Sequence, residues 1–112
     1  MMNDSFLKLN VNNVEEIEAV EGIFRKTLVY DDNLMMIQFK LLKGAELPLH
    51  SHPHQQMGYI ISGKLEFYVD NKTIILEAGD SYLVKSNIKH GAKVLETSIV
   101  IDVFRPARDD YK

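Results

Sequence analysis

The 112-residue sequence contains no cysteine and no tryptophan. Without cysteine, the chain has no disulfide bonds, no thiolate metal sites and no cysteine nucleophile. No apolar run approaches the roughly 20 residues of a membrane-spanning helix. The N-terminus, Met1 to Ser5, also lacks the basic and apolar regions of a secretory signal. We therefore expect a cytoplasmic protein without a membrane partner.

Positive charge is also scarce: 13 Lys and Arg residues stand against 16 Asp and Glu, giving a net charge of −3, and no basic run occurs. Nucleic-acid binding depends on a basic surface, so we do not expect nucleic acid as a partner. The length fits one domain, and no repeat or low-complexity linker divides the chain. We therefore take residues 1–112 as a single domain.

Short strands separated by turn residues make up most of the chain. In residues 34–42 apolar and polar side chains alternate, which is typical of a half-buried strand. The only helix that the sequence allows is a short one at residues 14–21, ended by Gly22. Turns at intervals of about eight to twelve residues predict an all-β sandwich or barrel. Further strands are predicted at residues 56–61, 65–69, 73–76, 82–84 and 98–104.

Three of the four histidines fall within five positions: His50, His52 and His54. In an extended segment, side chains two positions apart point to the same face, so His50 and His52 can reach one point. Pro48 and Pro53 argue against a helix here. Imidazole is a common ligand of zinc, iron, copper, nickel and manganese. The pattern predicts a metal site completed by ligands from elsewhere in the barrel.

The spacing around these histidines resembles the two motifs of the cupin superfamily. The first motif spans residues 44–63 and is matched by Gly44, His50, His52, Gln56 and Gly63. Gln56 stands where glutamate is usual. The second motif spans residues 79–94 and is matched more loosely, by Gly79, Asp80 and His90. Together the two motifs and their flanking strands cover most of the chain.

This resemblance implies a cupin double-stranded β-helix, a jelly-roll barrel. It also implies one divalent metal ion (zinc, nickel, iron or manganese) held by His50, His52, Gln56 and His90. An amide in place of a carboxylate leaves such a site one unit more positive, which favours anionic ligands. We expect His54 to lie beside the metal, facing the substrate or supporting the ligands, rather than to bind it.

A carboxylate, Asp102, lies within the apolar strand of residues 99–104. Strand alternation puts Asp102 on the same face as Val100 and Phe104. A charge there costs free energy unless it is paired or hydrogen-bonded. Asp102 therefore either pairs with Arg105 or Arg108, lies at an exposed strand end, or acts as an acid and base in catalysis.

A narrower resemblance, to the pectin-degradation cupins, rests on residues 50–54, on Gln56-x-Gly58-Tyr59 and on the ending from Asp102 to Tyr111. Those enzymes convert unsaturated uronates from the cyclic to the linear keto form. The resemblance implies that Asp102 and Arg108 are catalytic, with Arg108 binding the uronate carboxylate. It implies that Phe104 packs on the sugar ring.

Two other functions remain open: an iron-dependent cupin dioxygenase and a non-catalytic sugar-binding module. Small cupins generally pair through their sheets, so the resemblance also implies a homodimer. Residues 6–9, Phe6-Leu7-Lys8-Leu9, are the candidate for a strand that crosses to the partner.

Overall fold

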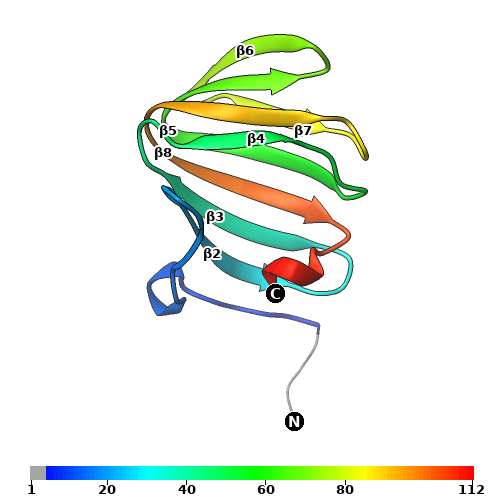
Figure 1. Cartoon of the computed structure of the whole chain (residues 1–112). Helices are drawn as coiled ribbons and strands as arrows, with labels where there is room; N and C mark the ends of the chain where they lie inside the picture. Colours follow the sequence, from blue (N-terminus) through cyan, green and yellow to red (C-terminus); the bar gives the residue numbers. More distant parts are fainter. Residues whose placement is uncertain (1–4) are drawn as a thin grey trace.

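The computed structural model describes residues 5–112, and nearly all of its regular structure is β-strand (Figure 1). The strands are β1 (Ile17–Val20), β2 (Ile23–Tyr30), β3 (Met35–Leu41), β4 (Glu46–His50), β5 (Gln55–Val69), β6 (Lys72–Glu77), β7 (Ser81–Val84) and β8 (His90–Arg105). Two 3-10 helices, η1 (Val11–Asn13) and η2 (Asp109–Tyr111), lie outside them. The described chain has no helix long and apolar enough to cross a membrane. The all-β prediction is confirmed.

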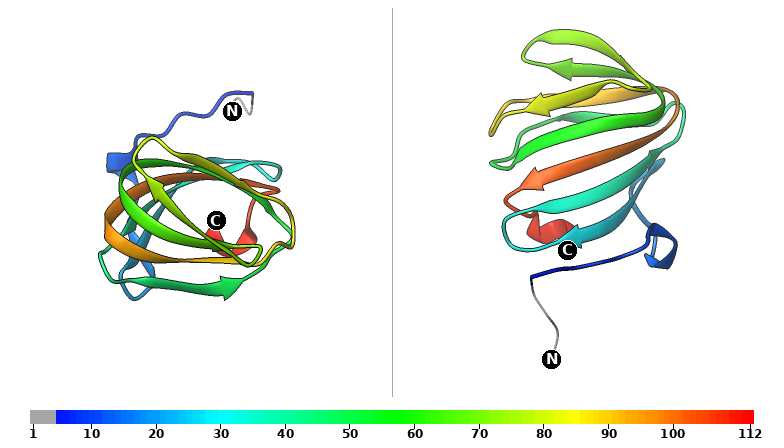
Figure 2. Two further views of the ribbon diagram at one scale, coloured as in Figure 1. Left: turned by 90° about the horizontal axis from the view of Figure 1, so that it is seen from above. Right: turned by 180° about the vertical axis from the view of Figure 1, so that it is seen from behind.

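The two long strands β5 and β8 form the frame of the barrel. They pair antiparallel from Gln55 opposite Arg105 to Val69 opposite His90, with irregular register between Ile60 and Leu65. Such irregularities bend a strand pair, so the two halves of β5 and of β8 take different further partners. The strands form one eight-stranded sheet in the order β1-β2-β3-β8-β5-β6, and in addition β4 pairs with β8 and β7 with β5. The views in Figure 2 show the resulting barrel, which confirms the predicted cupin jelly roll.

The predicted helix at residues 14–21 is wrong. Ile17–Val20 is instead β1, which pairs with β2 across a tight turn at Gly22, where φ is +79°. A helix of about eight residues is marginal in water, because its nucleation is unfavourable. Pairing with β2 gives the backbone of Ile17–Val20 hydrogen bonds that are more stable than those of so short a helix. The separately predicted strands 56–61 and 65–69 are halves of β5.

Apolar side chains fill the inside of the barrel on the faces that alternation predicts. In β3, Met35 and Ile37 are completely buried. One buried cluster comprises Ile60, Leu65, Phe67, Leu76, Val84, Ala92, Val94 and Val100, and a second comprises Met35, Ile37, Phe104 and Ala107. A cavity of about 110 Å³ remains inside the barrel, and polar side chains from β4, β5 and β8 meet at it.

Candidate functional site

Three of the four histidines converge beside the cavity, and two of them, His50 and His90, line it. His50 ends β4 and His90 begins β8, and these two residues lie directly opposite one another in the pairing of the strands. His52 follows β4 by two residues and is buried with His90, whereas His50 is half-buried. One ring nitrogen from each of the three lies within 4.8 Å of the others. The three imidazoles are therefore close enough to hold one metal ion.

The backbone fixes the orientation of all three rings. Each Nδ1 lies within hydrogen-bond distance of a carbonyl oxygen two residues away. The acceptors are the carbonyl groups of Pro48 for His50 (3.0 Å), of His54 for His52 (2.9 Å) and of Ile88 for His90 (2.9 Å). Because a carbonyl only accepts, Nδ1 is the protonated nitrogen and Nε2 carries the lone pair. Metal-binding histidines usually make such a hydrogen bond through the ring nitrogen that does not bind the metal.

The second ring nitrogen of His90 makes no hydrogen bond within the part of the chain that the structure describes. Its Nε2 is buried and has no hydrogen-bond partner there. Burial is the largest of the effects that lower the pKa of His90, to about 4. The ring is therefore neutral near pH 7, with its lone pair aimed into the histidine cluster. A buried polar atom without a partner is costly, and a bound cation would remove that cost.

The contact between His52 and Gln56 also fits a cation. The Gln56 amide nitrogen donates to Asp102 Oδ2 (3.0 Å) and to the Tyr82 hydroxyl (3.1 Å), so its oxygen faces His52 Nε2 at 3.1 Å. Both facing atoms then present lone pairs. Burial, followed by the charge of Arg108, lowers the pKa of His52, which disfavours a bridging proton. The three imidazoles and this amide oxygen fit a divalent metal.

Asp102 lies beside this cluster, and its hydrogen-bond partners are not the arginines that the sequence suggested. The carboxylate is buried, and it accepts hydrogen bonds from the Tyr82 hydroxyl (2.5 Å) and from Gln56. The alternatives of an exposed strand end and of a pair with Arg105 or Arg108 are therefore wrong. Burial raises the pKa of Asp102 to about 7, although both hydrogen bonds act to lower it.

Gly58 makes room for the contact between Tyr82 and Asp102. It lies opposite Tyr82 on one side of β5 and opposite Asp102 on the other. A Cβ at this position would lie 2.2 Å from Asp102 Oδ1 and 2.2 Å from Tyr82 Cε1. Tyr82 was not predicted from the sequence as a residue of the site. The inward face of residues 82–84, which Tyr82 shares with buried Val84, was the available signal.

The rest of the cavity is largely apolar, and Phe104 and Arg108 lie at its wall. Among the described residues that line it, Asp102 is the only carboxylate and Arg108 the only guanidinium. Four of the residues singled out from the sequence outside the histidine cluster thus face one space: Gln56, Asp102, Phe104 and Arg108.

His54 lies outside the group of three. Its ring centroid is 5.5 Å from that of His52, and its carbonyl group orients the His52 ring. Its own Nδ1 is buried without a hydrogen-bond partner among the described residues. The structure therefore gives the His54 backbone a contact that supports His52, and the role of the His54 side chain stays a prediction.

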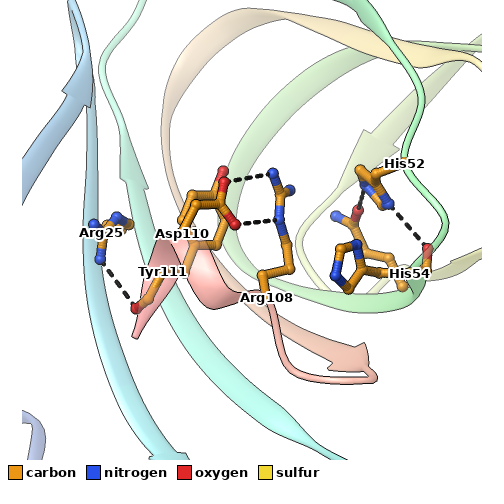
Figure 3. Close-up of polar contacts among 7 residues, drawn as sticks. Arg25, His52, His54, Arg108, Asp110 and Tyr111 are labelled. Carbon is orange, nitrogen blue, oxygen red and sulfur yellow. Dashed lines mark hydrogen bonds and ion pairs between the residues drawn. The ribbon is translucent and has the colours of Figure 1, made fainter. Parts of the chain in front are cut away.

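Arg108 is held by aromatic rings and by an ion pair. Its guanidinium lies 4.1 Å from the ring centroid of Tyr111 and 5.3 Å from that of Phe104. Asp110 accepts two hydrogen bonds from it, from Nε at 3.3 Å and from Nη2 at 3.0 Å (Figure 3). The Tyr111 carbonyl group in turn accepts hydrogen bonds from Arg25 and Thr27 of β2. These contacts dock the C-terminal segment against the barrel.

The barrel and its histidine cluster define the class of protein. The family model described as "Cupin domain" matches residues 37–104, and the chain belongs to this family. Among curated proteins, the pectin degradation protein KdgF of Dickeya dadantii (strain 3937) is 38% identical over 96 residues, which cover 84% of this chain and 87% of that protein.

Solved structures agree with this assignment. KdgF from Halomonas sp. is 33% identical with a TM-score of 0.85, and the match covers 90% of this chain and 94% of that one. An RmlC-like cupin from Shewanella frigidimarina NCIMB 400 is 35% identical with a TM-score of 0.87, covering 90% and 91% of the two chains.

Proposed function

We propose that this cupin is a metal-dependent enzyme that converts unsaturated uronates, released by pectin or alginate breakdown, from the cyclic to the linear keto form. The observation that carries the proposal is that a candidate metal centre, one carboxylate and one guanidinium surround the same cavity. The similarity to two KdgF proteins, one of them named for pectin degradation, supports the choice of substrate.

His50, His52, His90 and Gln56 would hold the metal, which is zinc, nickel, iron or manganese. When bound, it would act as a Lewis acid toward substrate oxygen atoms. Arg108 presents a planar fork that suits a carboxylate, and we assign it to the uronate carboxylate. Phe104, whose ring lies at the cavity wall, would pack on the sugar, with His54 facing the substrate from the side of the ligands.

Asp102 is the residue we assign to proton transfer. Its carboxylate would accept the proton of the hydroxyl group on C1 as the bond between C1 and the ring oxygen breaks. Asp102 would pass this proton to the released ring oxygen, which leaves an aldehyde at C1 and an enol at C5. A proton then adds to C4 while the enol hydroxyl group gives up its own, which yields the ketone at C5. The conversion is an isomerisation with no net oxidation. Tyr82 and Gln56 hold the carboxylate in place throughout.

The proposal predicts turnover of unsaturated galacturonate by the metal-loaded protein, measured as loss of the ultraviolet absorbance of its conjugated double bond. The rate should be the same in air and under argon, because the reaction consumes no oxygen. An iron-dependent dioxygenase would stop under argon. Binding of the sugar without turnover, with each of the four metals loaded in turn, would contradict the proposal and favour the sugar-binding module.

We also propose that the protein is a homodimer. Met57, Tyr59 and Leu83 are each about half exposed on the outer face of β5 and β7, where Met57 pairs with Leu83. Exposed apolar patches of this kind are typical of protein interfaces. Light scattering should give about twice the chain mass of 12.9 kDa, and Leu83→Glu should reduce it to one chain mass. A monomeric wild-type protein would contradict the proposal. The crossing of residues 6–9 to the partner stays a prediction.

A further inference from the structure

The Arg108 guanidinium already has a carboxylate bound to it. Asp110 lies two residues further along the chain and accepts from Nε and Nη2, which is the side-on bidentate arrangement of an arginine and a carboxylate. The same guanidinium lines the cavity wall. Asp110 therefore occupies two of the donors through which Arg108 could bind a ligand carboxylate.

Arg108 has contacts that hold it besides the one with Asp110. The rings of Tyr111 and Phe104 lie against its guanidinium, and Tyr111 is tied to β2 through its carbonyl group. The Asp110 side chain, by contrast, is 60% exposed, whereas that of Arg108 is 14% exposed. Ion pairs with such an exposed partner contribute little stability, so an incoming anion can replace Asp110 at small cost.

We propose that Asp110 is an internal counter-ion of Arg108, which occupies the guanidinium when the site is empty and gives way to the carboxylate of the ligand. Asp110 then sets the affinity of the site for anionic sugars, because the ligand must displace one negative group and bind beside it. The inference rests on the proposed function insofar as the displacing group is a uronate carboxylate.

The opposite role would be positioning, in which Asp110 holds Arg108 ready for the ligand. The two roles predict opposite changes in the affinity for anions. Removing the Asp110 charge strengthens anion binding if the residue competes with the ligand and weakens it if the residue positions the arginine.

The neighbouring aspartate offers a matched control. Asp109 lies in the same short helix, but its carboxylate pairs with Lys112 (2.9 Å) rather than with Arg108. Asp110→Asn and Asp109→Asn change the net charge by the same amount and preserve side-chain size. Any difference between the two variants therefore reports the contact with Arg108.

The experiment measures the dissociation constant of D-galacturonate by calorimetry on the metal-loaded protein. This saturated uronate lacks the C4–C5 double bond and so cannot be converted to the keto form. We expect Asp110→Asn to bind it about two- to fivefold more tightly than wild type, in line with the strength of exposed ion pairs. The dissociation constant of Asp109→Asn should differ from that of wild type by less than about twofold. For uncharged D-galactose, neither variant should bind more tightly than wild type. With unsaturated galacturonate, KM should fall in Asp110→Asn while kcat stays near that of wild type.

Weaker galacturonate binding by Asp110→Asn, or an equal change in Asp109→Asn, would overturn the inference. So would the absence of galacturonate binding in all three proteins. If galacturonate binding tightens as expected but unsaturated galacturonate is not converted, the counter-ion role stands and the proposed reaction fails.

Discussion

Replacing His90 with alanine is expected to reduce the bound metal to less than about a tenth of an ion per chain, and with it the turnover of unsaturated galacturonate. The expectation follows from the buried Nε2 of His90, which has no protein partner among the described residues, and from the Lewis-acid role that a bound metal plays. Elemental analysis of the purified protein measures the metal directly, independently of any assay.

His54→Ala is the matched control, because it removes an adjacent imidazole that lies outside the group of three. Its metal content should stay within about a factor of two of that of wild type, which is small against the tenfold or greater effect that ligand-supporting groups exert. A full complement of metal in His90→Ala would contradict the assignment of the metal centre. Thermal unfolding of both variants checks that the barrel is intact.

The Asp102→Asn variant is expected to lose about 10²- to 10⁴-fold in kcat, the usual contribution of a general acid or base. The amide keeps the size of the carboxyl group, and its oxygen can still accept from Gln56 or Tyr82. It cannot take up a proton from the substrate. Metal content and galacturonate binding should remain near those of wild type, so the loss should appear in kcat rather than in KM.

Two measurements distinguish a chemical role of Asp102 from a structural one. Tyr82→Phe removes a hydrogen bond to Asp102 but keeps the carboxylate, and it should retain much more activity than Asp102→Asn. If Asp102→Asn turned over unsaturated galacturonate at the rate of wild type, the proposed proton transfer would be wrong. A parallel fall in metal content would instead indicate that Asp102 acts by fixing Gln56.

Local pattern was enough to predict an all-β fold and the convergence of His50 and His52, whereas His90 was assigned to the same cluster only through the resemblance to the second cupin motif. Alternation in β3 and the two-residue spacing of His50 and His52 are properties of neighbouring residues, which the printed sequence contains. The error at residues 14–21 arose because a weak local preference lost to pairing with β2, a contact that local pattern does not encode.

The partners of Asp102 could not be predicted for a related reason. Sequence proximity suggested Arg105 or Arg108, but the true partners, Gln56 and Tyr82, lie on β5 and β7. They meet Asp102 because the register of both strands converges on Gly58. Register across three strands is set by pairing between segments far apart in the sequence, which the periodicity of one strand does not give.

The three carbonyl contacts of the histidine rings have a thermodynamic consequence. Each ring is oriented by its own short stretch of backbone, at His50, His52 and His90, so the ligand geometry exists before any ion arrives. Capture of the metal then requires little reorganisation, unlike in small domains whose folding and metal binding are one event. Chelation is therefore expected to remove a bound metal while the barrel stays folded, which thermal unfolding before and after chelation would measure.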